Sequence, residues 1–173
     1  MVDMGLRPGR SVRPLERPWV RYSYKKTKSY IPTLPVPKIH MFIMGENNPD
    51  FNVTLDLVAK SSVQIRDNAL EAARIVAHNF LEKKIPKNYF FRILLYPHQI
   101  IREKPIAEGA GADRYSRGMK LAFGKPSGRA VQVREGQTIM TLKTSKNFIE
   151  IAKEALKRSA SKLSTPTRIV EEL

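Results

Sequence analysis

The stretch "SVQIRDNALEAARIVAHNFLEKKIPKNYFFRILLYP", residues 62–97, decides the fold because its hydrophobic pattern changes period near Pro86. In the first part, apolar residues recur at helical spacing, at Ile65, Ala69, Ala72, Val76 and Phe80. This spacing predicts a helix that begins near Ser62 and ends before Pro86, since proline cannot continue a helix. The mostly apolar run at 89–97 predicts a buried strand. The apolar face of the helix should therefore cover a sheet.

Further strands are predicted on both sides of this unit. In "KIHMFIMG", residues 38–45, and "FNVTLDLVAK", residues 51–60, β-branched and aromatic residues alternate with polar ones, which is typical of strands. Farther along, "RAVQV" and "QTIMTLK", within 129–143, predict a hairpin that turns at Glu135 and Gly136.

A second helix is expected from about Ser145 to Lys162, where apolar residues again recur at helical spacing. After the "STP" break, "TRIVEEL" predicts a last strand along the sheet edge. The element order indicates an α+β fold, a two-layer α/β sandwich in which a mixed sheet carries both helices on one face. We expect residues 38–173 to form this single domain.

Residues 1–37 are expected to form an extended basic arm. Prolines are frequent there, and each one removes a backbone donor and discourages regular structure. Aromatic rings can stack on nucleic-acid bases and cations can neutralise phosphates, although the rings could instead pin the arm to the protein's own surface. The candidate RNA-binding residues of the arm are Arg7, Arg10, Arg13, Arg17, Trp19, Arg21, Tyr22, Tyr24, Lys25, Lys26 and Lys28.

The charge balance indicates a polyanionic partner. The chain has 31 Lys and Arg against 16 Asp and Glu, which gives a formal net charge of +15 over 173 residues. Nucleic acid is the first candidate for such a surface and an anionic membrane the second. No apolar run is long enough to span a membrane, and no signal peptide is recognisable, so we expect a soluble cytoplasmic protein.

No catalytic or metal-binding pattern supports an enzyme. The absence of cysteine excludes disulfides, thiolate metal sites and cysteine nucleophiles, and the three histidines have no ligand at metal-binding spacing. "GMKLAFGK" differs from a phosphate-binding loop in its glycine spacing, and Pro126 stands where Ser or Thr should follow the lysine. We expect neither enzymatic activity nor a cofactor.

The long glycine-rich, basic stretch "AEGAGADRYSRGMKLAFGKPSGRA", residues 107–130, has no continuous apolar face and is expected to be a functional loop. Together with the arm, it would give two flexible basic elements that suit an irregular folded RNA better than a regular duplex. A free RNA-binding module, such as a regulator or RNA chaperone, remains an alternative at this point.

Five motifs resemble one ribosomal family and occur in its order: "KIHMFIMG" at 38–45, "ALEAARI" at 69–75, "GADR" at 111–114, "AFGKPSG" at 122–128 and "GQTIM" at 136–140. The chain resembles large-subunit ribosomal protein L-ten-e, the archaeal and eukaryotic counterpart of bacterial L-sixteen, and it is most similar to the archaeal type. The resemblance implies a hammerhead-like sandwich that binds large-subunit rRNA near the tRNA-binding cleft and the peptidyl-transferase centre, with no catalysis of its own.

The resemblance also implies partners and site residues. The partners would be large-subunit rRNA, tRNA near the aminoacyl and peptidyl sites, neighbouring ribosomal proteins and late-assembly factors, all in the cytoplasm. The internal loop, residues 102–128, would point toward the tRNA sites. Its RNA-facing candidates, with the residue just beyond the loop, are Arg102, Lys104, Arg114, Tyr115, Arg117, Lys120, Lys125 and Arg129. Its flexibility would come from Gly109, Gly111, Gly118, Gly124 and Gly128.

Overall fold

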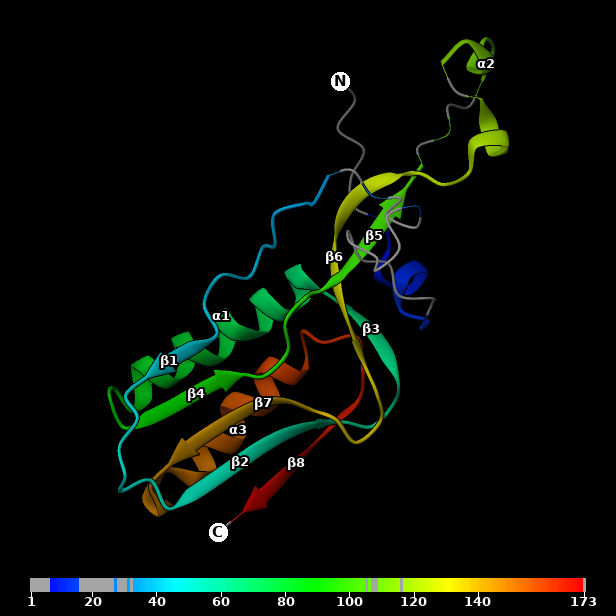
Figure 1. Ribbon diagram of the computed structural model, residues 1–173. Coiled ribbons are helices and arrows are strands. Elements are labelled where there is room, and N and C mark those ends of the chain that lie inside the picture. The colour runs from blue at the N-terminus through cyan, green and yellow to red at the C-terminus, as the bar shows by residue number, and fades with distance from the viewer. Residues whose placement is uncertain are drawn as a thin grey trace.

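The computed structural model describes residues 7–15, 27, 31, 33–104, 106, 109–115 and 117–172. The larger of its two sheets has five strands in the order β1-β4-β7-β2-β8, and each pairing is antiparallel (Figure 1). Their bounds are β1 Ile43–Gly45, β2 Val53–Ala59, β4 Tyr89–Ile93, β7 Thr138–Thr144 and β8 Thr167–Glu172.

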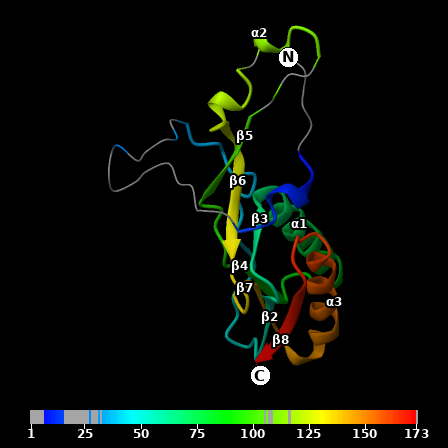
Figure 2. The same cartoon turned by 90° about the vertical axis from the view of Figure 1, so that its right-hand side faces the viewer.

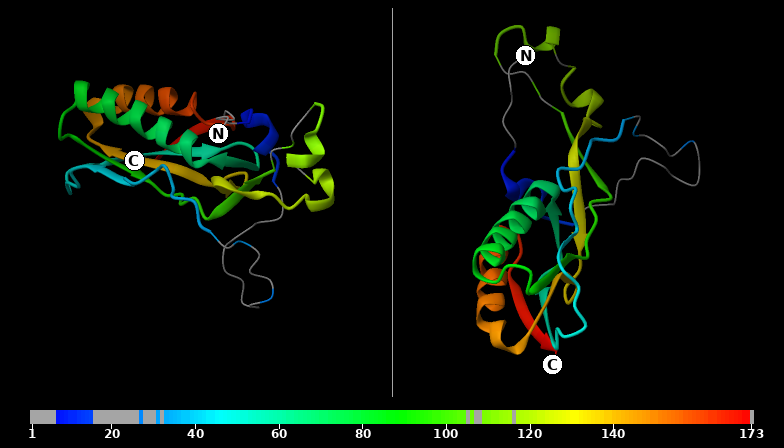
Figure 3. Two further views of the ribbon diagram at one scale, coloured as in Figure 1. Left: turned by 90° about the horizontal axis from the view of Figure 1, so that it is seen from above. Right: turned by 90° about the vertical axis from the view of Figure 1, so that its left-hand side faces the viewer.

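Two helices cover one face of this sheet, α1 (Asp67–Lys84) and α3 (Ile149–Ala160) (Figure 3). Small buried residues on both helices, such as Ala73 and Ala152, let them approach closely. The α+β prediction with both helices on one face is therefore confirmed. So is the edge position of the last strand, β8.

A smaller antiparallel sheet has the order β3-β6-β5, with β3 Val63–Arg66, β5 Gln99–Glu103 and β6 Lys125–Val133. Between β5 and β6 the chain forms a short helix, α2 (Ala112–Tyr115), and a 3-10 turn, η3 (Gly118–Leu121). Two other 3-10 turns are η1 (Gly9–Val12), near the start of the described chain, and η4 (Lys146–Phe148), just before α3.

The hairpin expected over 129–143 is not formed, and one mixed sheet is replaced by two antiparallel ones. The turn does lie at Glu135 and Gly136, but its backbone bonds to the end of β2. Gly136 N donates to Ala59 O (2.9 Å), and Ala59 N donates to Gln137 O (3.0 Å). These bonds to β2 fix the turn. The strands on its two sides, β6 and β7, therefore enter different sheets.

Several element bounds also differ from expectation; for example, the strand expected over 89–97 ends at Ile93. The segment from Ser62 was predicted to begin the first helix, but Val63–Arg66 forms β3, where Val63 and Ile65 are buried at alternate positions. Ile65 and Ala69 are four residues apart, which matches helical spacing. The helical pattern in the sequence therefore included a residue that belongs to the strand. The strand expected over 38–45 is limited to Ile43–Gly45, and β5 occupies the beginning of the expected loop.

A buried tyrosine fastens α1 to β4. The Tyr89 hydroxyl donates to Glu82 Oε2 (2.8 Å) and lies 2.9 Å from His78 Nδ1, both on α1, while Tyr89 itself is 1% exposed. Burial, and then the hydrogen bond to Glu82, raise the pKa of Tyr89 above its ordinary value. The phenol therefore stays protonated and able to donate.

Tyr89→Phe should lower the free energy of unfolding by about 1 kcal/mol, because the buried phenol loses its hydrogen bond to Glu82, whose exposed carboxylate can bond to water instead. Urea unfolding at neutral pH measures this change. Tyr115→Phe is the matched control, since Tyr115 is 83% exposed and its hydroxyl can bond to water. An equal loss from both substitutions would contradict the role of this bond.

Gly45→Ala should destabilise the protein strongly. Gly45 has φ +81°, and a Cβ there would lie 2.1 Å from Tyr89 O, a backbone atom of the neighbouring strand. Gly136→Ala is the control, since Gly136 has φ +79° but open space around it. The left-handed conformation alone costs about 1–2 kcal/mol, so a larger loss at Gly45 measured by thermal unfolding would isolate the steric clash.

Candidate nucleic-acid interface

Strands β5 and β6 form a stalk that extends beyond the helices and carries a loop at its end (Figures 1 and 2). The loop was expected over 102–128, but Arg102 pairs with Pro126 and Glu103 with Lys125. The described loop is therefore shorter, within residues 104–124. Pairing of the flanking strands gives this loop a stiff base.

Two of the expected RNA-facing cations hold the base of the loop together. Lys104 Nζ donates to Gly118 O (2.5 Å). Arg102 donates through Nη1 to Phe123 O, and its guanidinium carbon lies 4.0 Å from the centre of the Phe123 ring. Both cationic groups thus bond within the loop, and their role as RNA contacts stays a prediction.

The glycines of the loop fall into two groups. Gly109, Gly111 and Gly118 have positive φ values of 104°, 78° and 57°, as expected for positions where the backbone must bend. Gly124 also has a positive φ, and a Cβ there would lie 2.9 Å from the backbone carbon of Glu103, so only glycine fits. Gly128 does not belong with them, because it lies inside β6 with ordinary strand backbone.

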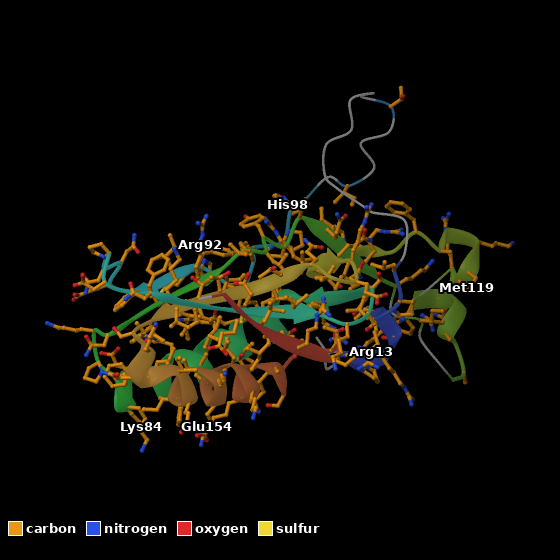
Figure 4. The ribbon with its side chains drawn as sticks, turned by 90° about the horizontal axis from the view of Figure 1, so that it is seen from below. Arg13, Lys84, Arg92, His98, Met119 and Glu154 are labelled. Carbon is orange, nitrogen blue, oxygen red and sulfur yellow. The ribbon has the colours of Figure 1, made fainter. Side chains whose placement is uncertain are left out.

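The loop presents exposed cations and exposed apolar side chains together. Tyr115 is 83% exposed and Met119 69% exposed, and Figure 4 shows Met119 at the end of the molecule that the loop forms. Met119 was not predicted, since a lone methionine in a loop carries no sequence signal. The exposed cations of the loop and the neighbouring strand are Arg114, Arg117, Lys120 and Lys125.

Arg129 does not belong to the RNA-facing residues that the sequence predicted. It was predicted to face RNA, but it is only 7% exposed. Its Nε donates to Pro35 O (2.5 Å) and its Nη1 to the Tyr96 hydroxyl (3.2 Å). Arg129 therefore fastens the segment that leads from the arm into the domain. Nearby, Lys38 N donates to Asp67 Oδ2 (2.9 Å), which ties the same segment to the start of α1.

The described start of the arm lies against the domain. Gln64 N donates to Arg13 O (2.8 Å), so the arm adds a bond to β3. Arg66 Nη2 donates to Arg7 O (2.5 Å), and Arg7 Nη2 donates to Lys104 O (3.3 Å) at the base of the loop. The arm and the loop thus meet at one end of the molecule, where Arg10 and Arg13 are exposed.

Between η1 and the domain lies an open hollow of about 300 Å³, lined partly by Arg66 and Lys162. The sequence did not single out these two cations, which come from β3 and from the end of the α3 region. The other candidate residues of the arm lie outside the described residues: Arg17, Trp19, Arg21, Tyr22, Tyr24, Lys25, Lys26 and Lys28.

Other kinds of site find no support in the described part of the chain. No group of three or more His, Asp or Glu side chains is placed there to hold a metal ion. None of the described helices is both long and apolar enough to cross a membrane. The described arm and loop expose cations and the loop also exposes aromatic rings, which fits binding to a polyanion.

Comparison with known proteins agrees with this geometry. The family described as "Ribosomal protein L16p/L10e" matches residues 20–170. "Large ribosomal subunit protein uL16" of the archaeon Archaeoglobus fulgidus is 48% identical over 170 residues, which is 98% of this chain and 94% of the relative. The protein of that name from Methanococcus aeolicus is 44% identical over 168 residues, 96% of this chain and 94% of the relative. The one from Hyperthermus butylicus is 46% identical over 143 residues, 82% of this chain and 79% of the relative. On this evidence the chain belongs to the ribosomal protein L16p/L10e family.

Proposed function

We propose that this protein binds large-subunit rRNA and helps to shape the tRNA-binding cleft near the peptidyl-transferase centre. Membership of the family makes it a structural protein of the large ribosomal subunit and not an enzyme, and its location is that of the subunit, the cytoplasm. The observation that carries the RNA-binding proposal is the stalk, which holds exposed cations and an exposed tyrosine at the end where the arm also lies.

An irregular folded RNA suits this interface better than a regular duplex. A major-groove reader presents a recognition helix, whereas α1 and α3 both pack against the sheet. A loop and an arm can instead follow the uneven surface of folded RNA, with cations on phosphates and rings on unstacked bases. Each base stacked on an aromatic ring contributes about 1–3 kcal/mol.

The loop is the part proposed to reach toward the aminoacyl and peptidyl tRNA sites. Its base is stiffened by the bonds of Arg102 and Lys104, so the exposed cations beyond them are held at a distance from the domain. Hydrogen bonds link the arm to the base of the loop and to β3. Binding of the arm to RNA would therefore restrict the conformation of the loop as well. Late-assembly factors and neighbouring ribosomal proteins are further proposed partners.

Fractionation of a native lysate on a sucrose gradient tests the ribosomal role. We expect near-stoichiometric amounts of the protein in large subunits, both at ordinary salt and after a wash at raised salt. A ribosomal constituent is held by many buried contacts, whereas a loosely bound module is stripped because salt screens phosphate contacts. Recovery mainly in the light fractions would instead support a free RNA-binding module.

The combined variant Arg114→Ala, Arg117→Ala and Lys120→Ala tests the loop. Its melting temperature should match the wild type, because these side chains are exposed. Its affinity for protein-free large-subunit rRNA should fall, and the slope of log affinity against log salt should decrease by up to about 3, near 0.9 for each lost phosphate contact. An unchanged slope in filter-binding titrations would remove the loop from the RNA interface.

A further inference from the structure

The five-stranded sheet has a second face that no described element covers. Both helices lie on one side of it (Figure 3). In Figure 4, Arg92 and His98 lie on the opposite side from Lys84 and Glu154, which belong to the helix layer. A sheet face that the described elements leave open is a candidate interaction surface.

Strand register identifies the side chains of this open sheet face. Ile43, Arg92, Thr141, Asp56 and Val170 are paired across the five strands in one row. On the three central strands, the residues of the adjacent row point to the helices and are 0% exposed: Phe91, Leu142 and Leu55. We define the open sheet face by the outward residues Ile43, Asp56, Phe90, Arg92, Leu94, Thr141, Lys143 and Arg168, with Tyr96 and His98 beyond β4.

Charge is distributed differently on the two sides. The ion pairs found among the described residues, Arg74–Glu71, Arg158–Glu154 and Lys153–Glu171, each involve α1 or α3. The cations of the helix layer are thus partly neutralised by neighbouring carboxylates.

The cations of the open sheet face have no such partners. Within the described chain, no hydrogen bond or ion pair engages the side chains of Arg92, Lys143 or Arg168. Asp56 lies on the same face and accepts a hydrogen bond from Thr141 Oγ1 (2.6 Å). The open sheet face therefore offers three cationic side chains, on three different strands, that have no direct ion-pair partner among the described residues.

Aromatic rings line the end of the open sheet face that lies nearest the stalk. Tyr96 is 40% exposed, and its ring centre lies 4.7 Å from that of His98 and 5.6 Å from that of Phe42. Beside them is an open hollow, lined also by Leu94 and the amide side chain of Gln137. Rings next to polar amides and cations are the combination that binds unstacked bases.

We propose that the open sheet face is a second RNA-binding surface, which takes phosphates on Arg92, Lys143 and Arg168 and an unpaired base on the Tyr96–His98 pair. The proposal rests on the proposed function and adds a surface to the arm and loop. Cations beside exposed rings favour RNA as the partner, because cations bind phosphates and rings stack on unpaired bases. The helix layer would then face away from this RNA.

Tethered cleavage tests the orientation directly. The chain has no cysteine, so Ile43→Cys and Ile75→Cys each create one labelling site. The two isoleucines form a matched pair, 56% exposed on the open sheet face and 41% exposed on α1. Each variant is labelled with an iron–EDTA probe and bound to protein-free large-subunit rRNA.

We expect hydroxyl radicals from position 43 to cut the rRNA at discrete places, several-fold more strongly than radicals from position 75. Equal cutting from both positions, or stronger cutting from position 75, would overturn the proposal. Failure of the labelled and unlabelled proteins alike to bind rRNA would instead defeat the proposed function on which it rests.

A pair of triple variants gives an independent measurement. Arg92→Ala, Lys143→Ala and Arg168→Ala together remove three charges from the open sheet face, and Lys83→Ala, Lys84→Ala and Lys157→Ala together remove three from the helix layer. The first set should reduce the salt slope of rRNA binding by about 2–3, and the second set by much less. Equal effects would mean that only net charge matters and would overturn the proposal. The proposal would also be overturned if the variant of the open sheet face bound rRNA normally but was lost from large subunits. That result would assign the face to a protein partner.

Discussion

The rest of the structure depends on the burial of β7 under the helix layer. Ile139, Met140 and Leu142 on this central strand are all 0% exposed. β7 pairs with β4 on one side and with β2 on the other, so its position sets the register of both neighbours. The same chain continues backward into β6, and β4 continues forward toward β5. The strands that make the stalk therefore extend from the best-packed part of the protein.

This continuity explains how a small domain can hold a loop at a distance. Without a fixed base, the glycines at 109, 111 and 118 would let the loop take many conformations. The cation–ring contact of Arg102 and the bond from Lys104 restrict its two ends. Some basic residues thus stabilise the loop while others remain exposed for a partner. A high net charge by itself does not distinguish the two roles.

The helix layer and the open sheet face also differ in how many of their basic residues have partners. The helix layer pairs some of its cations with carboxylates at helix spacing, as at Arg158 and Glu154, and surface pairs of this kind contribute little stability. Their main effect here is to reduce the positive potential of that side. Among the described residues, the three cations of the open sheet face have no ion-pair partner, so that side keeps more of its positive potential.

The sequence by itself determined the fold class, the two helices, the edge strand and the strong positive charge. Local hydrophobic period and net charge carry that information, and the motifs that resemble one ribosomal family agree with the family match. Tertiary structure alone decided that β6 and β7 separate into two sheets, because the turn at Gly136 bonds to β2, which is distant in sequence. It also decided that Arg129 is buried under Pro35 and Tyr96, whereas Arg114 is exposed. The same residue type has both roles, since burial depends on contacts between segments far apart in the chain.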